Sequence, residues 1–327
     1  MVGSTESSDE RFTVSARTFH VLAIVALALL CVIVVTGAAV RLTGSGLGCS
    51  DWPNCSPDKF VSIENPNQAI EQINRLFTGL VSMSVIAAVL GSLRRRPYRR
   101  DLVWLSVGLV VGVMGQAVLG GITVLVDLNP IAVAGHFVLS MFLVGDATVL
   151  VWRSGRPGGP RRPLVDHTSV TMARLAVASG AFLMVTGPAV TGTGPHGGDR
   201  SAPRFDFFLP DVTRIHGLNM WLYLVCALIV LIRLARTGAP AAVQRRGYAL
   251  LVAIVAQGVI GYTQYALEIP AGIVILHIIG ATAVFSLSVW FLLGLFEPVA
   301  TSEPDRRSER DAVGPGASAS PHVGSSA

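Results

Sequence analysis

Long apolar segments alternate with short polar ones along most of the chain. Eight such segments can be drawn, each near the ~20 residues that a helix needs to cross about 30 Å of hydrocarbon. They are residues 19–40, 70–92, 102–124, 132–152, 172–191, 213–234, 247–265 and 271–295. The segments lack the strict alternation of a half-buried strand, and a backbone in lipid must satisfy its hydrogen bonds internally. The pattern therefore predicts an all-α polytopic membrane protein with eight transmembrane helices.

The apolar segments fall into two similar halves. The sequence VTGAAVRLTG from Val35 aligns with VTGPAVTGTG from Val185, and QAVLGG from Gln116 aligns with QGVIGY from Gln257. Two copies of a four-helix unit are the simplest explanation of such matches. We therefore predict a fold made of two repeated four-helix bundles.

The repeat divides the chain into successive parts. They are a cytoplasmic N-terminal segment (1–18), an N-terminal four-helix bundle (19–152), a cytoplasmic linker (153–171), a C-terminal four-helix bundle (172–296) and a cytoplasmic tail (297–327). The first apolar segment is too long for a removable signal peptide, so we expect it to be retained. The tail is rich in Ser, Pro, Asp and Arg, and we expect it to be disordered because it has too little apolar content to pack.

Arginines are concentrated in the short loops after the second, fourth and sixth apolar segments. Cytoplasmic loops carry an excess of Lys and Arg, so we expect these loops and both termini in the cytoplasm and the protein in the cell membrane. The hydrophobic fraction of 51% and the charged fraction of 14% agree with a membrane class. The net charge of +5 is then a topology signal, and we expect the lipid bilayer, not nucleic acid, as its partner.

Four polar residues occupy matching places in the two halves. Asn74 aligns with His216, and His136 aligns with His277. With both termini inside, all four lie early in segments that enter from the outer face, at one depth. Imidazole suits iron, and facing helices of a bundle can present axial ligands to a haem. The alternative is a buried histidine bonded to a neighbouring helix, but repeat-related ionisable groups within spans favour a functional site.

The two halves differ in what they offer to such a haem. The C-terminal half has a complete pair, His216 and His277, whereas the N-terminal half has Asn74, a much weaker iron ligand. Three residues before Asn74 stands Glu71, where the C-terminal half has Thr213, and residues three apart share a helix face. We infer a cofactor half and a reaction half. The alternative for Glu71 is an interfacial carboxylate favoured by the helix dipole.

Two arginines and two cysteines are expected near the same outer level. Arg41 and Arg75 are placed to pair with Glu71 or with haem propionates, and a solvated, snorkelling side chain is the alternative for either. Cys49 and Cys55 flank a short loop on the oxidising side, where a disulfide is plausible. Free or redox-active thiols are the alternatives at these positions.

Several motifs resemble those of the haem A synthase family. They are GAAVRLTGSGLGCSDWPNC, AIEQINRLFTG, QAVLGGITVLVDLNP with GHFVLSM, RIHGLNMWLYL and LHIIGA. The resemblance extends across essentially all eight segments, and its first two motifs are the specific ones. Cys49 and Cys55 match the outer-loop disulfide pair of the family.

This resemblance implies an eight-helix fold with haem b bound in the C-terminal bundle and the substrate, haem O, in the N-terminal one. The implied reaction oxidises the C8 methyl of haem O to a formyl group through successive hydroxylations, with oxygen taken from water. His216 and His277 would hold the iron of haem b, and His136 would ligate the substrate iron. Glu71 would be the essential carboxylate.

The chain departs from the family at Asn74, because many members have histidine there. We therefore expect His136 to be the main ligand of the substrate iron, with Asn74 on the vacant side, and Arg75 and Arg41 as further substrate-haem contacts. The family also implies contact with haem O synthase, the protohaem farnesyltransferase that makes the substrate. The electron acceptor is unknown.

Two other classes of protein compete with this interpretation. A non-catalytic dihaem cytochrome for electron transfer would use the C-terminal pair equally well, but it leaves Asn74 and Glu71 unexplained. A transporter with repeated halves is the second alternative. It is disfavoured because the polar residues are expected near the outer surface and no segment is evidently broken.

Overall fold

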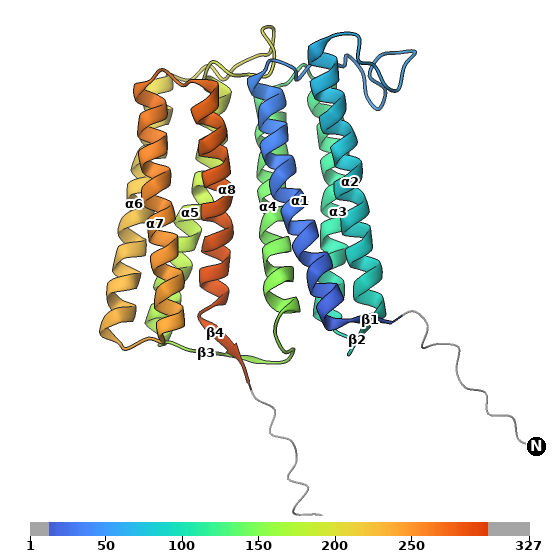
Figure 1. Ribbon diagram of the computed structural model, residues 1–327. Coiled ribbons are helices and arrows are strands. Elements are labelled where there is room, and N and C mark those ends of the chain that lie inside the picture. Colours follow the sequence, from blue (N-terminus) through green and yellow to red (C-terminus); the bar gives the residue numbers. More distant parts are fainter. Residues whose placement is uncertain (1–12, 300–327) are drawn as a thin grey trace, which may run out of the picture.

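The computed structural model describes residues 13–299, and within them eight long helices run side by side (Figure 1). They are α1 (Ala16–Leu42), α2 (Pro66–Arg94), α3 (Arg100–Leu125), α4 (Pro130–Ser154), α5 (His167–Thr193), α6 (Leu209–Arg236), α7 (Ala241–Ala266) and α8 (Ala271–Leu293). All eight are long and apolar enough to cross a membrane. The predicted all-α polytopic fold is confirmed, with one helix for each apolar segment.

The helices begin and end outside most of the predicted apolar segments. The side chains of Ser15, Asn65 and Asp166 each accept a hydrogen bond from the backbone N–H three residues further on. Such a cap satisfies a backbone donor that the helix leaves free, so the first turn can lie beyond the apolar segment. Apolar patterning therefore reports the thickness of the hydrocarbon, while capping residues set the helix ends. Only α8 ends earlier than predicted, at Leu293, before Gly294.

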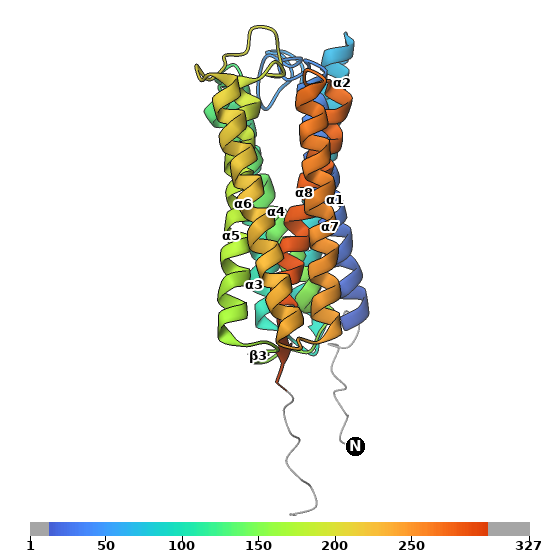
Figure 2. The ribbon, with the colours of Figure 1, turned by 90° about the vertical axis from the view of Figure 1, so that its left-hand side faces the viewer.

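Each half of the chain forms a closed ring of four helices. In the first half α1 and α3 each contact both α2 and α4, and in the second half α5 and α7 each contact both α6 and α8. Between the halves, α4 contacts α8 and α5, and α1 contacts α8. The contact of α4 with α5 in one half corresponds to the contact of α8 with α1 in the other. The two bundles are therefore arranged symmetrically, with α4 and α8 in contact at the centre. Figure 2 views it from the side of the C-terminal half.

Two apolar cores correspond to the two bundles. One is built around residues such as Phe19 and Leu109, from α1 to α4, and the other around Tyr223 and Leu234, mainly from α5 to α8. Phe137 of α4 packs against both cores. The residue next to His136 thus connects the two halves.

Short strands join the helices at the arginine-rich end of the molecule. Parallel β1 (Val14–Ser15) and β2 (Arg95–Arg96) form one pair, and antiparallel β3 (Arg161–Pro163) and β4 (Phe296–Pro298) form the other. Both ends of the described chain therefore lie at this end of the bundle (Figure 1). The side of the membrane that it faces stays a prediction.

The described residues include the start of the tail predicted to be disordered, and this start is ordered. Glu297 lies in β4 and forms an ion pair of 2.7 Å with Arg162 of β3. The remainder of that predicted tail, residues 300–327, lies outside the described residues, as does most of the predicted N-terminal segment.

Candidate functional site

His216 and His277 face each other across the C-terminal bundle. The centroids of their rings are 6.4 Å apart, and the ring planes are inclined by 63°. Both side chains are partly buried, and each lies about two turns from the N-terminal end of its helix, α6 or α8. A bond from a metal to an imidazole nitrogen is about 2 Å long, so one ion fits between rings at this separation. The structure thus brings the predicted axial pair together.

Residues of α5 and α7 hold these two histidines. Thr186 Oγ1 lies 2.8 Å from His216 Nδ1, which leaves Nε2 as the nitrogen available to a ligand. Gln257 Nε2 donates to the backbone oxygen of His277 at 2.6 Å. A Cβ on Gly261 would lie 3.0 Å from His277 Cε1, so the ring packs directly on α7. Both imidazoles are therefore positioned by the helices between which they lie.

The N-terminal bundle repeats the same contacts around different residues. Thr36 Oγ1 donates to Asn74 Oδ1 at 2.8 Å, and Gln116 Nε2 donates to the backbone oxygen of His136 at 3.1 Å. A Cβ on Gly120 would lie 3.2 Å from His136 Cε1. Because each contact has its counterpart in the other half, the two halves share one scaffold. They differ in the group that they present at the Asn74 position.

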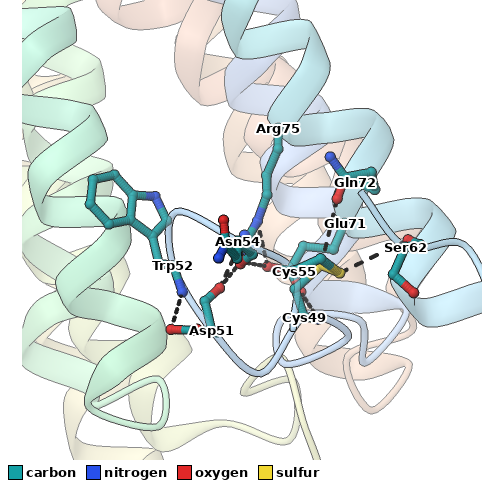
Figure 3. A network of polar contacts seen from close by, with 9 residues as sticks. All are labelled: Cys49, Asp51, Trp52, Asn54, Cys55, Ser62, Glu71, Gln72 and Arg75. Atoms are coloured by element: carbon teal, nitrogen blue, oxygen red, sulfur yellow. Dashed lines mark hydrogen bonds and ion pairs between the residues drawn. A yellow bond between two sulfur atoms is a disulfide. The ribbon is translucent and has the colours of Figure 1, made fainter. Parts of the chain in front are cut away.

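Glu71 is the centre of a buried polar network (Figure 3). Its side chain is 7% exposed, and Oε1 accepts hydrogen bonds from Arg75 Nε at 3.0 Å and Nη2 at 2.6 Å. Oε2 accepts the backbone N–H of Cys49 at 2.8 Å. Arg75 also donates to the backbone oxygens of Asp51 and Asn54. The carboxylate thus joins the first turns of α2 to the loop that follows α1.

That loop is fixed over the end of the N-terminal bundle at which α2 and α4 begin. A disulfide joins Cys49 and Cys55, and both residues are fully buried. A Cβ on Gly48 would collide with the backbone of α2, and a Cβ on Gly121 of α3 would collide with the Trp52 ring. The loop therefore packs on α2 and α3 together. The disulfide expected from the sequence is present, next to Glu71.

The two arginines considered with Glu71 have different surroundings. Arg75 uses Nε, Nη1 and Nη2 in contacts with Glu71 and the loop. Arg41, at the end of α1, donates through Nη2 to the backbone oxygen of Thr191 on α5 at 2.6 Å. Its Nε is buried and has no hydrogen-bond partner in the described part of the chain. Arg75 thus uses its donor nitrogens within the Glu71 network. Arg41 connects the two halves and still has an N–H group that can donate a hydrogen bond.

From the sequence, we expect the other four histidines, His20, His167, His196 and His322, to be solvated, because they lie at a helix boundary, in loops or in the tail. In the structure, two of them form hydrogen bonds. His20 Nδ1 lies 2.8 Å from Ser154 Oγ, and His196 Nε2 lies 2.8 Å from the backbone oxygen of Ile269. Both are partly buried, so the expectation was wrong for them. His167 is exposed as expected, and His322 lies outside the described residues.

Sequence reasoning missed the residues that position the candidate ligands. Thr36 and Thr186 belong to the aligned VTG motifs, and Gln116 and Gln257 begin the second pair of aligned motifs. The signal was therefore available, because polar residues repeated inside apolar segments are costly without a partner. These repeated polar residues align the two halves, but the sequence does not show which side chains they contact.

Comparison with known proteins gives the family context of this site. A family model described as a cytochrome oxidase assembly protein, COX15-CtaA, matches residues 20–197, more than half of the 327 residues. The chain is similar to the Heme A synthase of Bacillus pumilus, with 33% identity over 134 residues, which are 40% of this chain and 43% of that relative. For the Heme A synthase of Lysinibacillus sphaericus the values are 32% over 120 residues, 36% and 38%.

A longer match extends over most of the chain. The Protoheme IX farnesyltransferase of Thermus thermophilus is 30% identical over an alignment of 309 residues, which covers 86% of this chain and 48% of that relative. The chain thus spans about half the length, or less, of the curated relatives that it matches.

Proposed function

The chain belongs to the COX15-CtaA family of cytochrome oxidase assembly proteins, and from this premise we propose that it is a haem A synthase. In this proposal the enzyme is an oxidoreductase that converts the C8 methyl of haem O to a formyl group by successive hydroxylations. The relatives named Heme A synthase support this activity.

The proposed cofactor half is the C-terminal bundle. His216 and His277 would hold haem b, because their 6.4 Å ring separation fits one iron between two imidazoles. If His216 Nδ1 donates its proton to Thr186 Oγ1, Nε2 of that ring keeps its lone pair for the iron. Bound there, haem b would supply one-electron transfer.

The proposed reaction half is the N-terminal bundle, with haem O as substrate. His136 would ligate the substrate iron from α4, and Asn74 would lie on the vacant side, where its amide can hydrogen-bond a water. Asn74 is held by Thr36 and is part-buried. An amide is a weak iron ligand, so the vacant side would stay open to exchange.

The net chemistry assigns a task to Glu71. Conversion of a methyl to a formyl group with oxygen from water consumes one net water and releases four electrons and four protons per substrate. Loss of hydride equivalents leaves a cation-like carbon, which an adjacent carboxylate can stabilise, and attacking water must lose protons. Glu71 would serve one of these roles, and its bonds to Arg75 and to the Cys49 N–H would fix its position.

One observation carries the proposal: repeat-equivalent scaffolds hold His216 in one half and Asn74 in the other. Thr186 and Thr36 make the same 2.8 Å contact to these two residues. A second electron-transfer haem would need two strong axial ligands, whereas the N-terminal half offers His136 and the weak ligand Asn74. A non-catalytic dihaem cytochrome, the alternative, therefore accounts for only one half of the chain.

The proposal includes a membrane setting and partners. The protein would lie in the cell membrane with its arginine-rich end and both termini in the cytoplasm. A farnesyltransferase that makes haem O would deliver the very apolar substrate within the bilayer. The Thermus thermophilus relative supports this pairing, because a region similar to most of this chain covers about half of a protein named Protoheme IX farnesyltransferase. An electron acceptor, unidentified, would receive the four electrons.

The experiment that tests the proposal is chromatography of haems extracted from cells that make haem O. The cells would express the parent chain, Glu71→Gln or Glu64→Gln, where Glu64 is an exposed carboxylate of the same outer loop. We expect haem A from the parent and from Glu64→Gln, and no haem A from Glu71→Gln, with haem b still bound to all three. Bound haem b without haem A from the folded parent would instead support the electron-transfer cytochrome.

A further inference from the structure

The loop between α5 and α6 crosses from the C-terminal half onto the outer end of the N-terminal half. The backbone oxygen of Gly198 accepts the N–H of Gly46 at 2.8 Å. A Cβ on Gly198 would also come within 3.0 Å of the Leu128 side chain, in the turn before α4. The loop thus covers the end of the N-terminal bundle at which α4, the helix that carries His136, begins.

This loop brings a second arginine, Arg204, close to Arg41. A Cβ on Gly197 would overlap the Arg204 guanidinium, and a Cβ on the adjacent Gly198 would touch Arg41 Cγ at 3.6 Å. Two consecutive glycines therefore make room for both side chains.

Neither arginine has an acidic partner within residues 13–299. Arg41 Nη2 donates to the Thr191 backbone oxygen, and Arg204 Nη2 donates to that of Pro195 at 2.9 Å. Arg41 Nε and Arg204 Nη1 are buried and make no hydrogen bond with any described residue. Two neighbouring cations with buried free donors are unfavourable unless an anion joins them. Guanidinium groups match carboxylates best, because their N–H groups bind both oxygens.

We propose that Arg41 and Arg204 form a carboxylate site that takes a propionate of the substrate haem. The proposal rests on the proposed function, which places haem O in the N-terminal bundle. His136 lies six residues after Pro130, the first residue of α4, so it lies about 9 Å below the outer end of that helix. A haem ligated there points its charged edge toward the polar end of the bundle, where the two arginines lie. The C-terminal half thus contributes to substrate binding in the other half.

The test compares iron protoporphyrin IX, with free propionates, and its dimethyl ester. Each probe is titrated into the full-length protein whose C-terminal half already carries haem b, and binding is followed by absorbance. We expect the parent to bind the free acid about tenfold more tightly than the ester, as for one charge-assisted hydrogen bond. Arg204→Gln should lower the affinity for the free acid to that for the ester and leave the ester unchanged. Arg204→Lys should restore part of the preference, and Arg200→Gln, an exposed arginine of the same loop, should keep all of it.

Three outcomes would overturn the proposal. One is an equal loss of affinity for both probes in Arg204→Gln, which indicates a structural role. The second is that Arg204→Gln keeps the parental preference for the free acid over the ester. The third is a parent that binds acid and ester equally, as expected if the arginines bind a lipid phosphate. Each is compatible with haem A formation by the parent, so the proposed function is judged separately by haem chromatography.

Discussion

Thr186 Oγ1 lies 2.8 Å from His216 Nδ1, and this contact recurs at the aligned positions Thr36 and Asn74. A threonine on the first helix of each half therefore fixes the residue that the second helix presents. Thr186 also directs its hydroxyl toward the Leu183 backbone oxygen at 3.5 Å. When Thr186 donates there, its oxygen accepts the Nδ1 proton of His216, and Nε2 keeps the lone pair that a metal needs.

We predict that Thr186→Val weakens haem b binding by about 10- to 100-fold, the usual effect of losing the partner of a metal-ligating histidine. The midpoint potential of the haem that remains should also change, because the ring is less well oriented. Thr186→Ser should behave like the parent, since it keeps the hydroxyl. The measurements are haem retention during purification and a redox titration.

Thr193→Val is the control for this prediction, because among the described residues the Thr193 hydroxyl bonds only to the Ala189 backbone oxygen of its own helix. If Thr186→Val kept haem b at the parental potential, the assigned role of Thr186 would be wrong.

A second prediction concerns Asn74. The parent loaded with substrate haem should show one low-spin bis-histidine haem, that of the C-terminal half. Asn74→His should add a second low-spin signal in electron paramagnetic resonance, because Thr36 is already placed as Thr186 is. The double variant Thr36→Val, Asn74→His should form that signal less completely. Two bis-histidine signals from the parent would contradict the open site proposed for the N-terminal half.

The repeat and the apolar segments were sufficient to predict the helices and the matching levels of the histidines. They could not show that Glu71 pairs with Arg75 and with the Cys49 N–H, because that network depends on how the outer loop folds back. Helical spacing alone is compatible with Arg75 pairing to Glu71 or to a propionate. The position of Arg204 beside Arg41 could not be predicted for the same reason, because a loop that crosses between the halves has no periodic sequence pattern.

A third prediction concerns the disulfide between Cys49 and Cys55. In denatured protein without reductant, alkylation should modify only the two free cysteines, Cys31 and Cys226, and with reductant it should modify all 4 cysteines. Cys49→Ser should release Cys55, so that three cysteines react without reductant. Mass spectrometry counts the modifications. Four alkylated cysteines in the unreduced parent would show that the loop cysteines are free thiols.

The last prediction separates the two roles considered for Arg75. Its guanidinium bonds to Glu71 and to the backbone oxygens of Asp51 and Asn54. Arg75→Gln should therefore lower haem A formation at least about tenfold, as for a lost charge-assisted hydrogen bond, and speed amide hydrogen exchange in residues 48–55. Haem b retention should not change, because His216 and His277 lie in the other bundle.

Arg75→Lys is the matched variant for this test. Lysine keeps the charge but lacks the planar fork that reaches the carboxylate and the loop together, so it should restore only part of the haem A formation and of the exchange protection. If Arg75 bound a propionate instead, Arg75→Gln would reduce the preference for the free acid over its dimethyl ester and leave exchange in the loop unchanged. Since Glu71 and the loop already occupy Nε, Nη1 and Nη2 of Arg75, we expect the loop, and not the preference for the free acid, to respond.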